Sequence, residues 1–132
     1  MWVKICGTTS LGDALLAVKA GADALGFIFA PSKRRVSVEQ AASIIAQLPA
    51  QVEKVGVVTE HNPGEIVRLV QGAGLTALQL HMNHQPGLTQ ELRRSLGERV
   101  KLIQVIAVAA EVQDAAALRV SLVEPLLSLI HI

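Results

Sequence analysis

The sequence is poor in several residue types on which particular classes of protein depend. Aromatic side chains make up 2% of its 132 residues, so its core has to be built from Ala, Val, Leu and Ile. It has one cysteine, Cys6, which excludes a disulfide framework, and its Cys and His residues lack the spacing of zinc ligands. We therefore expect a reducing, cytoplasmic setting, no bound metal and no cofactor.

Excess charge and long apolar runs are also lacking. The formal net charge is +1, which gives no basic face of the kind that nucleic-acid binding needs. The N-terminal residues do not form a charged segment followed by a long apolar one, so we expect no signal peptide. The apolar stretch from Val120 to Ile132 contains Glu124 and Pro125 and is shorter than the ~20 residues of a membrane helix. We expect neither a nucleic acid nor a membrane as a partner.

Apolar residues make up 51% of the sequence, which is enough for a packed core. We expect residues 1–132 to form one domain. Apolar segments return roughly every 25 residues with a helical pattern between them, which is typical of a parallel sheet. The expected strands are 3–5, 23–29, 52–58, 76–80, 100–108 and a run from 120 onward. The expected helices are 11–20, 37–48, 63–72, 86–97 and 111–118. Since apolar and polar residues do not strictly alternate, both faces of the strands, Val3 to Ile5 included, should be buried.

Local signals support these boundaries. Ser37 and Gln40 have the spacing of a capping box, and Pro63 suits the first turn of a helix. Gly21 suits the position just after a helix. Gly26 lies inside an expected strand, where it indicates a crowded point or a close approach of backbones.

Two architectures fit this alternation, an open doubly wound sheet and a (βα) barrel. The G-x-G-x-x-G and G-x-x-x-x-G-K-[ST] patterns of nucleotide-binding open sheets are absent. A (βα) barrel instead places function in the loops after its strands, and the positions at or after successive strand ends are Cys6, Arg34, Thr59, His81 and the segment 107–109. We therefore predict an α/β fold, a partial TIM (βα)8 barrel, because a full barrel takes at least ~200 residues and this chain supplies five βα units and a sixth strand.

Cys6 is the first candidate for chemistry. It ends the first expected strand and precedes Gly7 and three hydroxyl residues that can cap a helix. Ligands of α/β proteins bind at this end of the strands. The alternative for a lone cysteine is a small buried hydrophobe.

Five segments resemble a known family in order and spacing. They are Lys-Ile-Cys-Gly-Thr-Thr at 4–9, Gly-Ala-Asp-Ala-Leu-Gly-Phe-Ile-Phe at 21–29, Pro-Ser-Lys-Arg at 31–34, Val-Gly-Val at 55–57 and Leu-Gln-Leu-His at 78–81. Together they resemble the phosphoribosylanthranilate isomerase family of tryptophan biosynthesis, over residues 2–108. The resemblance implies an Amadori rearrangement of N-(5-phosphoribosyl)anthranilate to 1-(2-carboxyphenylamino)-1-deoxyribulose 5-phosphate, so the partner would be a small phosphosugar substrate.

The resemblance also implies roles for four residues. Cys6 would be the general base, and it would need a nearby positive charge to form a thiolate. Arg34 would hold the anthranilate carboxylate, and Lys4 and His81 would complete the substrate-binding set. Lys4 can equally be a strand lysine that reaches the bottom of the barrel or forms an ion pair there. His81 can instead be a structural histidine that is hydrogen-bonded to a neighbouring loop.

The chain also departs from the family pattern. Thr8 replaces an Ile, Met82 and Asn83 replace Gly-Glu, and the Asp that ends the family's sixth strand has no counterpart here. The seventh and eighth units, which hold the phosphate in the family, are absent, and we identify no general acid. We therefore expect little or no isomerase activity from this chain alone, and we interpret it as a truncated or frameshifted gene product.

Two alternatives remain open. One is another phosphate-binding barrel, such as a sugar-phosphate epimerase, which would place metal ligands or paired acids at the strand ends. The other is a non-catalytic barrel fragment. An incomplete barrel has two open sheet edges and an uncovered apolar face, so such a fragment could form homo-oligomers or aggregate.

Overall fold

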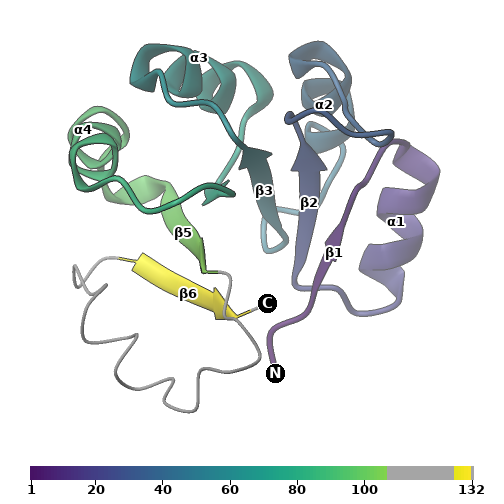
Figure 1. Cartoon of the computed structure of the whole chain (residues 1–132). Coiled ribbons are helices and arrows are strands. Elements are labelled where there is room, and N and C mark those ends of the chain that lie inside the picture. Colours follow the sequence, from purple (N-terminus) through teal and green to yellow (C-terminus); the bar gives the residue numbers. More distant parts are fainter. Residues whose placement is uncertain (107–126, 132) are drawn as a thin grey trace.

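The computed structural model describes residues 1–106 and 127–131, which form a curved parallel sheet with helices along its convex side (Figure 1). The strands lie in chain order, and each pairs in parallel with the next. They are β1 (Lys4–Cys6), β2 (Ala24–Ile28), β3 (Glu53–Val58), β4 (Ala77–Leu80), β5 (Lys101–Ile106) and β6 (Leu127–His131). The helices are α1 (Leu11–Lys19), α2 (Val38–Ile45), α3 (Pro63–Ala73) and α4 (Pro86–Leu96), with a short 3₁₀ helix η1 (Gly97–Arg99). The helix expected at 111–118 and the segment 107–109 lie outside the described residues.

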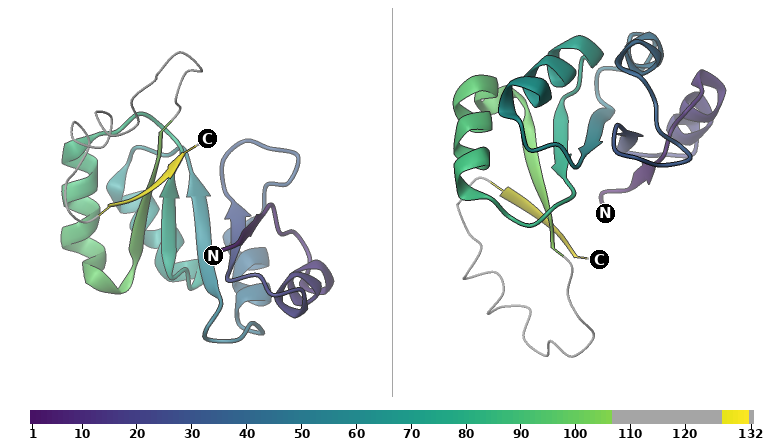
Figure 2. Two further views of the ribbon diagram at one scale, coloured as in Figure 1. Left: turned by 90° about the horizontal axis from the view of Figure 1, so that it is seen from below. Right: turned by 45° about the horizontal axis from the view of Figure 1, so that its top comes forward.

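This arrangement distinguishes between the two architectures. A doubly wound sheet has helices on both faces and a strand order that reverses, whereas the described strands run in sequential order with helices on one face (Figures 1 and 2). The α/β prediction with part of a (βα)8 barrel is therefore confirmed.

Serine side chains cap the first two helices, as the sequence predicts. The Ser10 hydroxyl accepts a hydrogen bond from the Asp13 amide at 3.2 Å and caps α1. The Ser37 hydroxyl accepts from the Gln40 amide at 3.1 Å, and the Gln40 side chain accepts from the Ser37 amide at 2.9 Å, which completes the capping box of α2. These bonds satisfy amides that have no partner within the helix.

The sheet separates two apolar clusters. The larger cluster lies between the sheet and the helices and includes Phe27, Ile66 and Leu78. The smaller cluster lies on the concave face, where one side chain from each of β2, β3, β4 and β5 meets the others. Its members are Ala24, Val55, Ala77 and Ile103. Strands β2 to β5 thus contribute apolar side chains to both faces, as the lack of strict apolar–polar alternation in their sequences predicts.

The prediction of a buried first strand is wrong. Ile5 is 46% exposed, and on the neighbouring helix Leu15 and Leu16 are exposed as well. The reason is topological: β1 is the first strand of the described sheet and pairs only with β2, so nothing among the described residues covers its other side. An apolar sequence indicates that a strand can be buried, but the strands and helices packed beside it determine whether it is buried.

Candidate active site

Cys6 is the last residue of β1 and lies against a glycine of the next strand. It pairs in register with Gly26, and a Cβ on Gly26 would lie 2.9 Å from the Cys6 sulfur. The amides of Gly7 and Thr8 both donate to the Gly26 carbonyl at 3.0 Å, so the chain turns sharply over β2 directly after the cysteine. The expectation that Gly26 marks a close approach is confirmed, and the side chain that it admits is Cys6, which is exposed rather than buried.

Arg34 reaches the same place from the loop after β2. Gly7 has a φ of +86°, and a Cβ on it would lie 2.7 Å from Cδ and 3.1 Å from Nη1 of Arg34. The Ser32 hydroxyl accepts from the Arg34 amide at 3.1 Å and shapes this loop. Arg34 and Cys6 therefore line one pocket of about 340 Å³, the rim pocket, although 27 residues separate them in sequence. Asp13 also lines it.

A second pocket opens from Cys6 toward the concave face of the sheet. This inner pocket has a volume of about 460 Å³, and its polar lining includes Lys4, Cys6, Gln79 and His81. Lys4 and Cys6 are two residues apart on β1, so both side chains point to this face. Within the described part of the chain, Lys4 forms no ion pair, and the ion-pair interpretation of this lysine therefore has no support here.

His81 follows β4 and is exposed to the inner pocket. Its backbone amide donates to the Val58 carbonyl at 2.9 Å, but its ring makes no hydrogen bond to any described residue. The interpretation of His81 as a structural histidine bonded to a neighbouring loop is therefore not supported. The loop after β4 is held by Gln104 instead. The Nε2 of Gln104 donates a hydrogen bond to the Met82 carbonyl at 2.6 Å.

Sequence reasoning missed two glutamines, Gln79 and Gln104. Each interrupts an apolar strand, in Leu-Gln-Leu and Ile-Gln-Val, and this was the signal available. A buried amide in such a strand must find a hydrogen-bond partner or contact a ligand. Gln104 faces the helices and supports the loop after β4, whereas Gln79 faces the inner pocket.

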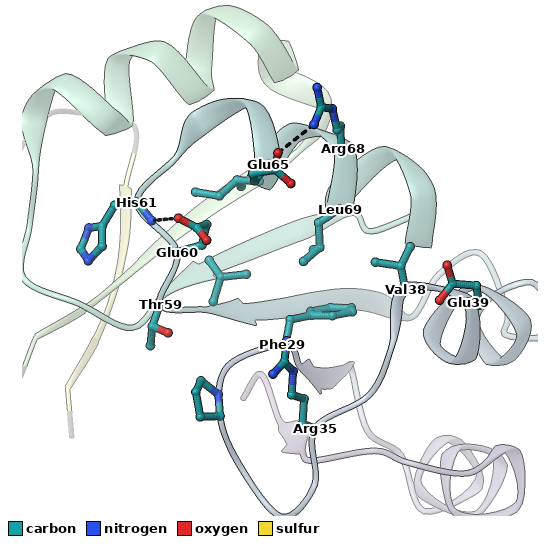
Figure 3. A pocket seen from close by; sticks show the side chains of 13 residues that line it. Phe29, Arg35, Val38, Glu39, Thr59, Glu60, His61, Glu65, Arg68 and Leu69 are labelled. Carbon is teal, nitrogen blue, oxygen red and sulfur yellow. Dashed lines mark hydrogen bonds and ion pairs between the residues drawn. The ribbon is translucent and has the colours of Figure 1, made fainter.

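The largest cavity lies away from Cys6 and Arg34. It has a volume of about 680 Å³ and is lined by residues of β3, α2 and α3 and the loops beside them (Figure 3). Two of its carboxylates already have partners: Glu65 pairs with Arg68 at 2.7 Å, and Glu60 accepts from the amides of His61 and Asn62 at 2.8 and 2.9 Å. These two backbone hydrogen bonds lower the pKa of Glu60. Size alone therefore does not make this cavity the candidate site.

The opposite end of the strands carries structural interactions. Asp23 accepts a hydrogen bond from the Val3 amide at 2.7 Å, which fits the structural role expected for it. Glu53 accepts from Thr76 at 2.6 Å and from Lys101 at 2.5 Å. Burial raises the pKa of Glu53, but hydrogen bonds from Lys101 and Thr76 and the charges of Lys101 and Lys54 outweigh it, so this pKa is lowered.

The site thus offers a thiol, a guanidinium and an imidazole at or after the carboxyl ends of β1, β2 and β4. The ammonium comes from Lys4, the first residue of β1, whose side chain lines the inner pocket. The inner pocket has no carboxylate in the lining that the structure describes. Such a set can hold an anionic or polar ligand and remove a proton from it, but it shows no group placed as a general acid. In the part of the chain described, no helix has the length and apolar character needed to cross a membrane.

Comparisons with known proteins identify the family of this chain. Residues 3–127 match the family model of N-(5'-phosphoribosyl)anthranilate (PRA) isomerase. The N-(5'-phosphoribosyl)anthranilate isomerase of Symbiobacterium thermophilum is 50% identical over 86 residues, which cover 65% of this chain and 39% of that relative. That of Thermotoga maritima is 44% identical over 110 residues, which cover 83% of this chain and 52% of the relative.

A solved structure shows the same fold. The crystal structure of phosphoribosyl anthranilate isomerase in complex with reduced 1-(o-carboxyphenylamino)-1-deoxyribulose 5-phosphate superimposes with a TM-score of 0.76 and 40% identity. The match covers 83% of this chain and 55% of that one, so the chain spans about half the length of the relatives it matches. With most of its length matched by the family model, the chain belongs to the phosphoribosylanthranilate isomerase family.

Proposed function

We propose that this chain provides the base and the carboxylate-binding side of an active site for the isomerisation of N-(5'-phosphoribosyl)anthranilate in tryptophan biosynthesis. The observation that carries the proposal is that Cys6 and Arg34 line one pocket on either side of Gly7, at the carboxyl end of the sheet. Family membership supports it, because relatives that share this segment are named for that reaction.

Each group has a part in the rearrangement. Cys6, as the thiolate, takes the proton from C2 of the opened sugar, and Lys4 and Arg34 line the pockets that Cys6 also lines. The planar guanidinium of Arg34 binds the anthranilate carboxylate. Lys4 and His81 line the inner pocket, whose volume of about 460 Å³ suits a small ligand. A free thiol is stable in a reducing compartment, and we propose the cytoplasm as its setting.

The acid that opens the sugar ring is not assigned. The reaction needs both proton removal and proton donation, and each such group contributes ~10²–10⁴-fold. We therefore propose that the 132-residue chain alone turns the substrate over at least ~100-fold more slowly than an ordinary enzyme does.

Binding of the reduced product analogue, reduced 1-(o-carboxyphenylamino)-1-deoxyribulose 5-phosphate, tests the proposal by isothermal titration. We expect Arg34→Met to weaken binding by about 10-fold or more, because it removes a charge-assisted hydrogen bond. Arg35→Met is the matched control, since Arg35 lines the large outer cavity and should leave binding unchanged. A folded wild-type chain that does not bind the analogue would contradict the proposal.

Growth of a tryptophan auxotroph that lacks this isomerase tests the role of Cys6. The chain is expressed with the part of the Thermotoga maritima relative that the alignment leaves uncovered, supplied as a second polypeptide. We expect growth with the wild-type chain and not with Cys6→Ser, because a hydroxyl is a far weaker base than a thiolate. Equal growth with both would exclude Cys6 as the base.

A further inference from the structure

Gln79 is a buried polar residue whose hydrogen bonding is incomplete. It lies in β4, its residue is only 6% exposed, and its Oε1 has no hydrogen-bond partner among the described residues. The side chain lines the inner pocket together with Lys4, Cys6 and His81. An amide left in this state costs free energy, so its presence calls for an explanation.

The surroundings of Gln79 leave one direction in which a partner can lie. On the strands to either side, the residues in register with it are Val57 and Ile103, both apolar. Two residues earlier on β4, Ala77 belongs to the apolar cluster of the concave face. The side chains on these three sides offer no hydrogen bond, so the inner pocket, which Lys4 and His81 also line, is the side from which a donor can approach.

We propose that Gln79 binds a ribose hydroxyl of the substrate through its Oε1, close to the carbon that Cys6 deprotonates. This inference rests on the proposed function and adds a residue to its binding site. The unpartnered atom is an acceptor, so it needs a donor, and a sugar hydroxyl is a neutral donor, whereas carboxylate and phosphate oxygens are acceptors. Cys6 lines the same pocket, which places the hydroxyl near the reacting end of the sugar.

Gln104 provides an internal comparison. It is 1% exposed and lies one strand away, and its Oε1 also has no hydrogen-bond partner among the described residues. The difference is its Nε2, which donates to backbone carbonyls, with the shortest bond to Met82 at 2.6 Å, and its position on the helix side of the sheet instead of at the inner pocket. A structural glutamine destabilises the protein when it is replaced, because carbonyls lose their donor. A ligand-binding glutamine whose side chain makes no hydrogen bond to the described protein does the opposite: its replacement by an apolar residue of similar size stabilises the unliganded protein and weakens ligand binding.

The experiment compares Gln79→Met with Gln104→Met in the full chain, by thermal unfolding and by titration with the reduced product analogue and with anthranilate. We expect Gln79→Met to raise the melting temperature by a few degrees, to weaken analogue binding about 10-fold, and to leave anthranilate binding unchanged, because anthranilate has no ribose. Gln104→Met should lower the melting temperature. Gln79→Leu serves as a second variant if methionine does not fit the site.

The outcomes separate this inference from the function on which it rests. If the wild-type chain binds the analogue and both Gln79 variants bind it equally well, the inference fails and the proposed function stands. A fall in melting temperature for both variants, or an equal loss of anthranilate binding, would mean that Gln79 supports the fold and would also overturn the inference. If the folded wild-type chain does not bind the analogue, both proposals fail.

Discussion

Two glycines create the space in which Cys6 and Arg34 meet. Gly26 admits the cysteine, and Gly7 adopts a φ of +86° and lies beneath the arginine side chain. A side chain at either position would occupy the volume that the functional groups use. The placement of the thiol and the guanidinium therefore requires glycine at both positions.

Gly26→Ala tests this dependence. The added Cβ would lie 2.9 Å from the Cys6 sulfur and 3.2 Å from its Cα, and a backbone atom cannot move away as a flexible side chain can. We expect unfolding free energy to fall by about 1–3 kcal/mol and analogue binding to weaken, as measured by urea denaturation and titration. Gly12→Ala is the control: nothing lies within 4 Å of its Cβ, and because Gly12 is in α1 the change should stabilise by about 0.5–1 kcal/mol. Equal effects at both positions would contradict the argument.

Glu53 gives a pH-dependent contribution to stability at the other end of the strands. Its pKa is lowered in the folded protein, so the stabilisation is fully present above its unfolded value of about 4.5 and is lost as the pH falls through the folded pKa. We expect Glu53→Gln to cost about 1 kcal/mol near pH 7, because the Lys101 side chain is largely exposed, and progressively less as the pH falls below about 4.5 toward the folded pKa. Urea denaturation of both proteins from pH 3 to pH 7 measures this difference, and a difference that does not change with pH would rule out an ionised Glu53 as its source.

At the scale of the element, the sequence was sufficient where the determining contacts are local. The start of α2 follows from Ser37 and Gln40, and the end of α3 from Gly74, which has a φ of +76°. It was insufficient where distant contacts decide. Ile5 is exposed because β1 lacks a second neighbour among the described strands, and Gln79 could be recognised as a pocket residue only once Val57 and Ile103 were placed beside it. The site followed the same division: the motifs named Cys6 and Arg34, but only the fold brings in Gln79.

The capping box of α2 makes the local part of this argument testable. Ser37→Ala removes the hydroxyl that accepts from the Gln40 amide, and we expect unfolding free energy to fall by about 1 kcal/mol in urea denaturation. Ser43→Ala is the matched control within the same helix, because its exposed hydroxyl makes no hydrogen bond among the described residues and alanine favours helix. A comparable loss for Ser43→Ala would mean that the capping hydrogen bond is not what stabilises α2.

At the scale of the whole molecule, the large exposed apolar side chains lie beside β1. These side chains come from the chain start, β1 and α1, and are Met1, Trp2, Ile5, Leu15 and Leu16. They flank a strand whose outer edge has no partner in the described sheet, and unpaired edges and contiguous apolar surface both promote association. We therefore propose that the 132-residue chain self-associates through this surface.

Leu16→Lys tests that proposal, because Leu16 is 66% exposed and its replacement should cost little fold stability while it places a charge in the apolar surface. Gln90→Lys adds the same charge on α4, away from β1, and serves as the control. We expect light scattering over a concentration series to show a lower average mass for Leu16→Lys than for the wild type and for Gln90→Lys. If all three proteins have the same mass at each concentration, the surface beside β1 does not drive association. A reduction seen with both variants would instead point to net charge, because the two substitutions share only the added lysine.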